Sequence, residues 1–257
     1  MKYAVIGNPI DFTKSPLIFN FLFDELNIKS SYGKLLLKTA DEFPFVFQQG
    51  YSGFSITAPF KQSIMPHLDF LSDEVKQIGS VNTVVLKEGK SFGYNTDCLG
   101  VVNALKDAGV SLQAKRCLVL GAGGAARAAI YALKKEGAQI NVFNRTSEKA
   151  KALAQEFEVS HILEADIDEI IRNTDIIVDA LPAGVSLLKN KELHKNIIVL
   201  DASYPKSVYE HSDIKCLIGG EKWLLHQAIP AFKLFTGLEL DKTNYNQKAL
   251  IDILIKS

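Results

Sequence analysis

The stretch from Leu118 to Thr146, LVLGAGGAARAAIYALKKEGAQINVFNRT, decides the fold of this chain. It predicts a short buried strand, a glycine-rich turn, a helix over residues 124–136 and a second strand over residues 140–143. Such a unit is typical of folds that bind a dinucleotide, because the bare amides that open the helix suit a pyrophosphate. A plain glycine turn is the alternative, and the two flanking strands argue against it.

The small residues of the turn have separate expected roles. Gly121 permits the tight turn, Gly123 lets the backbone approach a phosphate, and Ala126 permits close packing of the helix on the strand. We therefore expect the cofactor to contact the turn residues Gly121, Ala122, Gly123, Gly124 and Ala125.

The end of the second strand indicates which dinucleotide binds. An acidic residue there would bond the ribose hydroxyls of NAD, but the chain carries Asn144, Arg145 and Thr146, with Lys149 one turn later. A guanidinium offers paired donors to phosphate oxygens, whereas a carboxylate would repel a 2′-phosphate. These residues predict NADP rather than NAD, and the alternative is the solvated basic start of a helix. Thr146 is also expected to cap the helix that follows.

Composition excludes several classes of protein. The chain has 257 residues, 47% of them hydrophobic, and a formal net charge of zero. A sizeable core is therefore expected, and a nucleic-acid partner is not. The apolar runs are too short to cross a bilayer, so no membrane partner is expected. The three cysteines show no paired spacing, which favours a reduced, cytoplasmic protein without a disulfide frame or a metal site.

Alternating strands and helices predict an α/β protein in two domains, the second with a doubly wound parallel sheet. We expect Ser15 to cap a helix that Pro16 opens. Domain boundaries are expected at residues 1–100 and 101–220, with helices within 221–257 that pack back on the first domain. The expected strands are 3–7, 32–37, 53–57, 81–86, 91–94, 117–120, 140–143, 176–179 and 197–201, and the expected terminal helices are about 222–235 and 244–255.

Polar stretches in the otherwise apolar first domain contain candidate catalytic and substrate-binding residues. Their hydroxyls, amides and one lysine–aspartate couple, Lys61 with Asp97, would suit a small polyhydroxylated acid. A lysine can pass a proton to or from the oxygen on the carbon that gains or loses a hydride, and a nearby carboxylate would orient the lysine. Alternatively, Asp97 only caps a helix and Lys61 is an ordinary surface lysine. The stretches are GNPIDFTKSP, GFSITAPFK, GSVNTV and GYNTD.

These motifs, together with GAGGAARA, NRTSEKA, DASYP and GGEKWLLHQAIPAFKLFTG, resemble the shikimate dehydrogenase family over nearly the whole chain. The resemblance implies a Rossmann-like NADP domain beside a substrate domain. It implies that Lys61 and Asp97 are catalytic and that Ala202 and Gly220 lie beside the cofactor. The substrate-binding residues that it implies are Thr13, Ser15, Thr57, Asn82, Tyr204 and Gln227.

The resemblance also implies an activity. NADPH would reduce 3-dehydroshikimate reversibly to shikimate, in the biosynthesis of aromatic amino acids, by a monomer or homodimer that needs no metal. One alternative is a paralogue that acts on quinate or another cyclic hydroxy acid. Another is a catalytically weak, NADP-binding regulatory or sensor protein.

Several residues depart from the family pattern. Phe12 stands where histidine is usual, and Ser55 where asparagine is usual. Asp179 and Leu181 change the Asn-Ala-Thr-Pro version of the segment DIIVDALPAG. A negative charge at Asp179 is expected to weaken NADPH binding unless another group pairs with it.

Overall fold

The computed structural model describes residues 1–204, 206–241 and 243–256, so Pro205 of the DASYP motif lies outside the described residues. The chain divides into two compact units. The first unit is Met1–Thr96 with Gln227–Ser257, and the second unit is Asp97–His226. The boundary at which the second unit ends, between His226 and Gln227, therefore falls inside the helix α9 (Gly220–Thr236) rather than at residue 220.

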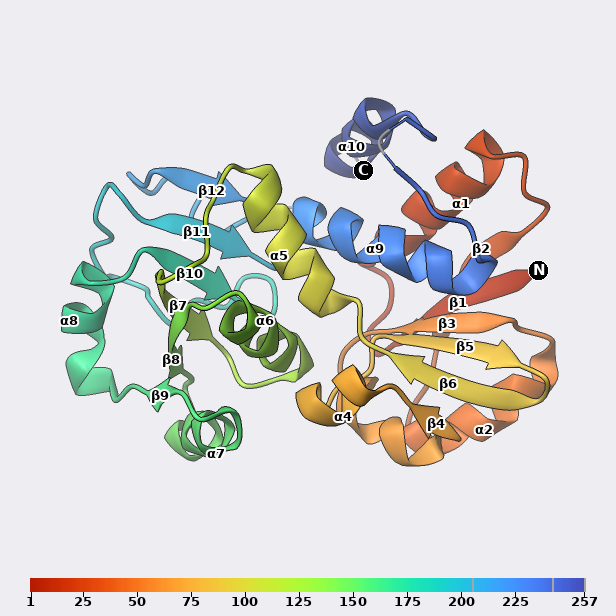
Figure 1. Cartoon of the computed structure of the whole chain (residues 1–257), viewed down its shortest axis with the longest axis horizontal. Coiled ribbons are helices and arrows are strands. Elements are labelled where there is room, and N and C mark those ends of the chain that lie inside the picture. Colours follow the sequence, from red (N-terminus) through yellow and green to blue (C-terminus); the bar gives the residue numbers. More distant parts are fainter. Residues whose placement is uncertain (205, 242, 257) are drawn as a thin grey trace. The chain divides into compact units, whose positions relative to one another are not determined.

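A six-stranded sheet forms the centre of the first unit, in the order β2-β1-β3-β5-β6-β4 (Figure 1). β1 pairs in parallel with both β2 and β3, whereas β5 pairs antiparallel with β3 and β6. The carboxyl ends of β1 and β3 therefore lie at the same edge of the sheet. The strands are β1 (Lys2–Gly7), β2 (Ser31–Leu36), β3 (Gly53–Ile56), β4 (Phe70–Leu71), β5 (Thr83–Lys87) and β6 (Lys90–Tyr94).

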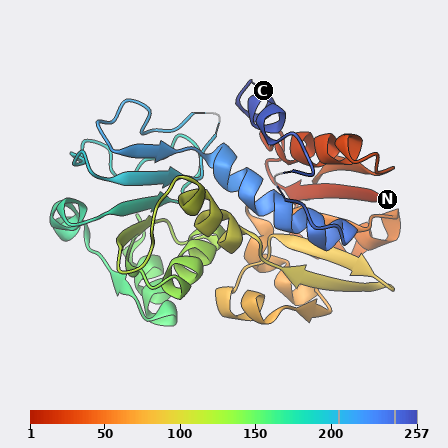
Figure 2. The ribbon, with the colours of Figure 1, turned by 45° about the horizontal axis from the view of Figure 1, so that its top comes forward.

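One face of this sheet carries α1 (Ser15–Glu25), the latter half of α9 and α10 (Gln247–Lys256) (Figure 2). Aromatic rings fill the space beneath them. The Tyr3 and Phe235 rings lie 4.9 Å apart, and the Tyr3 hydroxyl donates to the Phe235 carbonyl over 2.8 Å. Phe19 of α1 stacks on Tyr32 at 4.2 Å. This packing is why the end of α9 belongs to the first unit, and the C-terminal helices do pack on that unit as expected.

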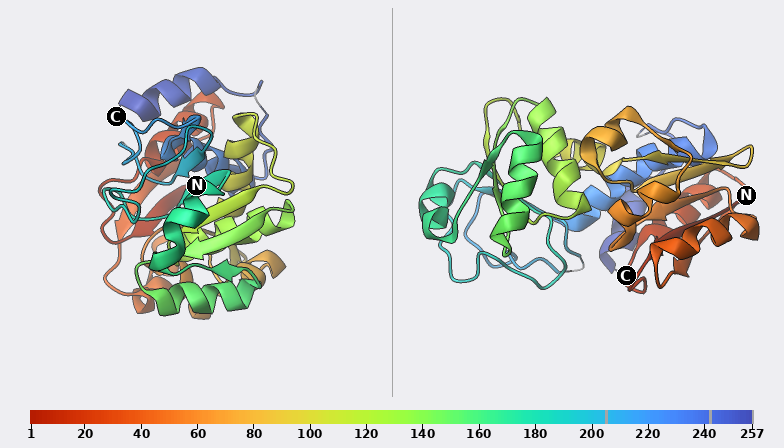
Figure 3. Two further views of the ribbon diagram at one scale, coloured as in Figure 1. Left: turned by 90° about the vertical axis from the view of Figure 1, so that its left-hand side faces the viewer. Right: turned by 90° about the horizontal axis from the view of Figure 1, so that it is seen from below.

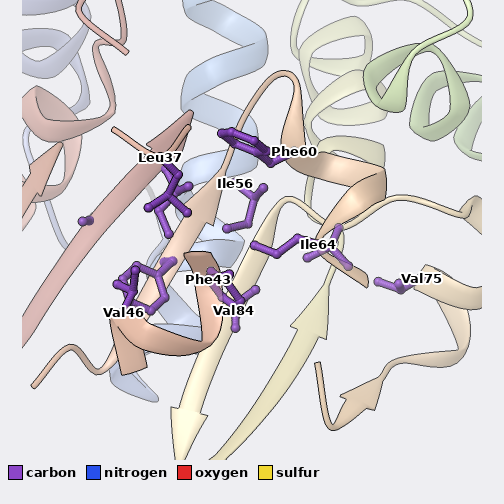
Figure 4. Packing of buried hydrophobic residues seen from close by; sticks show 12 residues of the cluster. Leu37, Phe43, Val46, Ile56, Phe60, Ile64, Val75 and Val84 are labelled. Carbon is purple, nitrogen blue, oxygen red and sulfur yellow. The ribbon is translucent and has the colours of Figure 1, made fainter. Parts of the chain in front are cut away.

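The opposite face of the sheet carries the short helices α2 (Phe43–Val46), α3 (Phe60–Ser63) and α4 (Asp73–Ile78). Their apolar side chains meet those of the strands in one core cluster, which includes Phe43, Ile56, Phe60, Ile64 and Val84 (Figure 4). Cover on both faces explains the continuous runs of buried residues in β1 and β3.

The second unit has a fully parallel sheet, in the order β12-β11-β10-β7-β8-β9. α6 and α7 lie on one face of this sheet and α8 on the other (Figure 3), as expected for right-handed crossovers between parallel strands. The order reverses between β7 and β10, which is where ligands bind in doubly wound folds. The elements are α5 (Asp97–Asp107), β7 (Arg116–Leu120), α6 (Gly124–Lys135), β8 (Gln139–Phe143), α7 (Ser147–Phe157), β9 (Ser160–His161), α8 (Ile167–Arg172), β10 (Ile176–Asp179), β11 (Ile198–Asp201) and β12 (Cys216–Ile218).

The expected α/β fold class is confirmed, but two details are wrong. Lys14, not Ser15, occupies the N-cap position of α1 and no side chain caps that helix, because the Thr13 and Ser15 hydroxyls contact each other. Thr146 holds the N-cap position of α7 but makes no capping bond. Periodicity also missed the two- and three-residue strands and the 3-10 turns η1 (Ala40–Glu42), η2 (Phe47–Gln49), η3 (Met65–His67) and η4 (Glu164–Asp166).

No helix among the described residues combines the length and the apolar content that crossing a membrane requires.

Candidate active site

The loops that follow β1 and β3 pack directly on each other in the first unit. A Cβ atom on Gly7 would lie 2.4 Å from Thr57 Cγ2, so only glycine lets these loops approach so closely. The Asn8 amide donates to the Ala58 carbonyl over 3.0 Å. Thr57 and the GNPIDFTKSP loop therefore share one edge of the sheet.

Thr13 and Ser15 lie together on that loop. The Thr13 hydroxyl donates to the Ser15 hydroxyl over 3.2 Å, and the Ser15 amide donates to Thr13 Oγ1 over 3.3 Å. Ser15 is buried, and between the two the buried Lys14 donates from Nζ to the Leu254 carbonyl of α10 over 2.5 Å. The two hydroxyls are thus held on a loop that is fixed to the C-terminal helix.

Asn82 is the centre of a buried polar network in the first unit. Its Nδ2 donates to Thr96 Oγ1 over 2.9 Å and to Gln227 Oε1 over 3.1 Å. Its Oδ1 accepts from the Thr96 amide over 2.7 Å and from the Thr83 hydroxyl over 2.9 Å. Two of the expected substrate residues, Asn82 and Gln227, are therefore brought together from positions 145 residues apart.

Lys61 lies in α3, one turn beyond Thr57, and its backbone ties it to the Asn82 network. The Lys61 carbonyl accepts a hydrogen bond over 2.7 Å from the amide of Val81, the residue that directly precedes Asn82. Asp97 is a buried residue that begins α5, and its carbonyl accepts from the indole nitrogen of Trp223 over 3.2 Å. Lys61 belongs to the first unit and Asp97 to the second, so their pairing stays a prediction.

The glycine turn of the second unit has a geometry that fits a pyrophosphate. Gly121 adopts a φ of +106°, which L side chains rarely adopt, and its amide donates to the Phe143 carbonyl over 2.9 Å. Apart from Gly123 and its two chain neighbours, no described residue has an atom within 4 Å of the Cβ position of Gly123, which is the N-cap of α6 and has no side-chain cap. The first amides of α6 are therefore available to an anion in open space.

The expected 2′-phosphate residues lie at the carboxyl end of β8, the strand next to β7. Asn144 Nδ2 donates to the Thr146 carbonyl over 3.1 Å and so shapes this loop. Arg145 and Lys149 are exposed. Two cations thus lie at the end of the strand next to the glycine turn, and cationic side chains of this kind fit a phosphorylated ribose.

Asp179 ends β10 and is 1% exposed. Its Oδ2 accepts from the Tyr209 hydroxyl over 2.7 Å, and its Oδ1 accepts from the Leu181 amide over 3.0 Å. Burial raises the pKa of this carboxyl to about 6, against the hydrogen bonds from Tyr209 and Leu181, and the nearby Asp201 raises it further. The Asp179 carboxylate, for which the sequence indicated no partner, therefore accepts a hydrogen bond from the Tyr209 hydroxyl.

Gly220 opens α9 against the loop that follows β11. A Cβ atom there would lie 2.5 Å from the Ala202 carbonyl oxygen and 2.6 Å from that of Ser203. Glycine is thus required for backbone packing, and the structure brings Gly220 and Ala202 together. Tyr204 lies in the same loop of the second unit. Its expected contact with the substrate stays a prediction.

Sequence reasoning missed Tyr209, Thr83 and the anchoring role of Lys14. Thirty residues separate Tyr209 from Asp179, and no spacing rule links them. The unpaired aspartate was the only signal, because a buried carboxylate requires a donor. Among the described residues, no group of three His, Cys, Asp or Glu side chains could hold a metal ion.

Comparison with known proteins places both units in one family. Residues 5–84 match the shikimate dehydrogenase substrate binding domain, and residues 103–215 match the shikimate / quinate 5-dehydrogenase family. The chain is 36% identical to shikimate dehydrogenase (NADP(+)) of Aquifex aeolicus (strain VF5), over 93% of this chain and 92% of that protein. It is 37% identical to shikimate dehydrogenase (NADP(+)) of Bacillus cereus (strain AH187), over 91% and 92%.

A solved structure agrees with these relatives. The crystal structure of shikimate 5-dehydrogenase from Thermus thermophilus, in complex with NADP(H) and shikimate, superposes with a TM-score of 0.83 at 30% identity. The match covers 99% of this chain and 100% of that one. The likeness carried by the separate sequence motifs is confirmed over both units, and the chain belongs to the shikimate dehydrogenase family.

Proposed function

We propose that this protein is an NADP-dependent shikimate dehydrogenase, which reduces 3-dehydroshikimate reversibly to shikimate in aromatic amino-acid biosynthesis. Family membership supports the reaction. The observation that carries the proposal is the buried Asn82 network, which gathers amides and hydroxyls from three segments at the carboxyl edge of the first sheet. Such groups suit the alcohols of a small cyclic acid.

The first unit supplies all but one of the proposed substrate contacts. Thr13 and Ser15 present two hydroxyls that can donate to a carboxylate, and Thr57 lies on the adjoining loop. Asn82 and Gln227 face the ring hydroxyls in this proposal, and each would exchange a hydrogen bond of the present network for one to the substrate. Tyr204 of the second unit would contact the carboxylate.

Lys61 is the proposed acid–base group. When bound, the cofactor supplies or accepts the hydride. Lys61 Nζ gives a proton to the oxygen that becomes an alcohol and takes it back in the reverse reaction. Asp97 orients the lysine and holds the reacting hydroxyl, and the ammonium stabilises negative charge on that oxygen.

Lys61→Met tests this role. We expect kcat to fall on the order of 10²–10⁴-fold while KM for shikimate changes little, because proton transfer is lost but most contacts remain. Lys87→Met, on an exposed lysine at the far end of β5, is the matched control and should behave like the wild type. Near-normal turnover of the Lys61 variant would remove this lysine from the mechanism.

NADP is the proposed cofactor, held by the turn residues 121–125, by Asn144, Arg145, Thr146 and Lys149, and by Ala202 and Gly220. Arg145→Ala should raise KM for NADPH well above its effect on KM for NADH, because the guanidinium bonds only the 2′-phosphate. Arg172→Ala, on an exposed arginine at the end of α8, serves as the control. Unchanged NADPH kinetics would refute the assignment of Arg145.

One substrate panel tests the proposed function directly. The enzyme is assayed for reduction of NADP⁺ and of NAD⁺ with shikimate, quinate and related cyclic hydroxy acids. Preferential turnover of shikimate with NADP⁺ is expected. Preference for quinate would indicate the paralogue, and absence of turnover with intact NADP⁺ binding would indicate a binding protein.

We further propose a cytoplasmic monomer or homodimer. None of Cys98, Cys117 and Cys216 forms a disulfide bond within the described residues, which supports a reducing compartment. Light scattering after gel filtration distinguishes one chain from two, and a tetramer would contradict the proposal.

A further inference from the structure

We propose that Asp179 is a positioning residue for the cofactor: with Tyr209, it holds the backbone of Ala180 and Leu181 against the nucleotide turn at Gly121. This inference rests on the proposed NADP site, and its subject is Asp179, a residue that departs from the family pattern, together with the tyrosine that bonds it. The argument depends only on contacts within the second unit.

The Asp179 carboxylate links a side chain on one segment to the backbone of another. Both its oxygens accept: Oδ2 from the Tyr209 hydroxyl at 2.7 Å and Oδ1 from the Leu181 amide at 3.0 Å. Tyr209 is itself fixed, because its ring is 4% exposed in the apolar core beneath α8 and its amide donates to Ser207 Oγ over 3.1 Å. Leu181 is therefore tied, through Asp179, to a tyrosine that lies thirty residues beyond Asp179 in the chain.

The segment that Asp179 holds, Ala180 and Leu181, packs directly against the glycine turn. A Cβ atom on Gly121 would lie 3.4 Å from both the Ala180 carbonyl oxygen and Leu181 Cδ2. The Ala180 amide donates over 3.0 Å to the carbonyl of Leu120, the residue that directly precedes Gly121. A displacement of residues 180–181 would therefore change the space in which the turn presents its amides to a phosphate.

Asp201 is the other acidic group that faces this site. It is the register partner of Asp179 on β11. Its oxygens accept from the Ser203 amide over 2.8 Å and from the Ser207 hydroxyl over 2.5 Å. Each carboxylate thus has its own donors, and Ser207 links the Asp201 network to the amide of Tyr209.

The experiment compares Tyr209→Phe, Asp179→Ala and Asp179→Asn with a matched control, Tyr131→Phe. The Tyr131 hydroxyl is buried in α6 and has no hydrogen-bond partner among the described residues. Two quantities are measured: Kd for NADP⁺ by calorimetry, and hydrogen exchange of the segment 180–187 in the cofactor-free protein. Trp223 fluorescence and circular dichroism verify that each variant is folded.

We expect Tyr209→Phe and Asp179→Ala to raise Kd for NADP⁺ about tenfold and to speed exchange of residues 180–187 by a similar factor, because a hydrogen bond to a buried charge is lost. Asp179→Asn should recover most of both losses, since a carboxamide oxygen still accepts from the Leu181 amide. Tyr131→Phe should change neither quantity.

Unchanged exchange and unchanged Kd in folded Tyr209→Phe would overturn the proposal. So would equal losses in Asp179→Asn and Asp179→Ala. Neither measurement uses shikimate, so a protein that binds NADP⁺ without turnover would contradict the proposed function and leave this test intact. The exchange arm uses no cofactor and decides the anchoring role even if NADP⁺ does not bind.

Discussion

Replacing Asp179 by asparagine should flatten the pH dependence of stability of the second unit. The pKa of this buried carboxyl is about 6 in the folded protein, against an ordinary value of 3.8. Between these values the unfolded chain has already lost the proton that the folded state retains. The folded state then binds more protons, so the free energy of unfolding falls as pH rises from about 4 to about 6 and is constant above that range.

The structure sets the size of this effect. A pKa difference of roughly two units corresponds to about 3 kcal/mol over the whole titration. Between pH 4.5 and pH 7.5 the wild type should lose about 2 kcal/mol relative to Asp179→Asn. With a urea slope of about 2 kcal/mol per molar, the difference between their unfolding midpoints should change by about 1 M. Other titrating groups are common to both proteins and cancel in the comparison.

The fluorescence of Trp223 provides the assay. It is the single tryptophan of the chain, is 4% exposed and lies in the second unit, so its emission reports the unit that contains Asp179. Urea titrations of both proteins at several pH values give the midpoints. Parallel curves across this pH range would refute the reasoning, because they would mean that Asp179 titrates alike in the folded and unfolded states.

Two further substitutions test anchors elsewhere in the fold. Lys14→Met removes the Nζ donor to the Leu254 carbonyl, and exchange of α10 amides, measured by mass spectrometry, should rise on the order of tenfold. Gly220→Ala places a methyl group 2.5 and 2.6 Å from two backbone oxygens of residues 202–203 and should lower the free energy of unfolding by about 1–3 kcal/mol in urea titrations. Gly219→Ala, which meets only the end of a flexible side chain, should cost less; equal losses would contradict the packing argument.

The nucleotide-binding unit was predictable because its signals are local. The strand, turn and helix around Gly121 follow from periodicity and from the conformational freedom of glycine within a short segment. The same holds for the cations at Arg145 and Lys149, because they directly follow a strand whose position the pattern fixes. Strands of two or three residues, such as β4 and β9, contain too few residues to show any period.

The candidate site in the first unit was predictable only as separate polar stretches. Asn82 belongs to one of these polar stretches, whereas Gln227 was indicated only by the family resemblance, and nothing in their spacing joins them. Their hydrogen bond exists because the latter half of α9 returns to the first sheet, where Phe235 packs on Tyr3. Long-range burial, rather than local pattern, made that contact.

The sequence by itself determined the α/β class, the parallel sheet with its glycine turn, and the preference for a phosphorylated ribose, because each depends on neighbours within one strand–turn–helix segment. Only the tertiary structure decided that Asp179 has a partner. A buried carboxylate requires a hydrogen-bond donor, but this requirement does not identify the residue that donates. Packing in the core beneath α8 brings the Tyr209 hydroxyl to Asp179. The position of the unit boundary within α9 was also decided only by the tertiary structure. The latter half of this continuous helix belongs to the first unit because Phe235 packs on Tyr3.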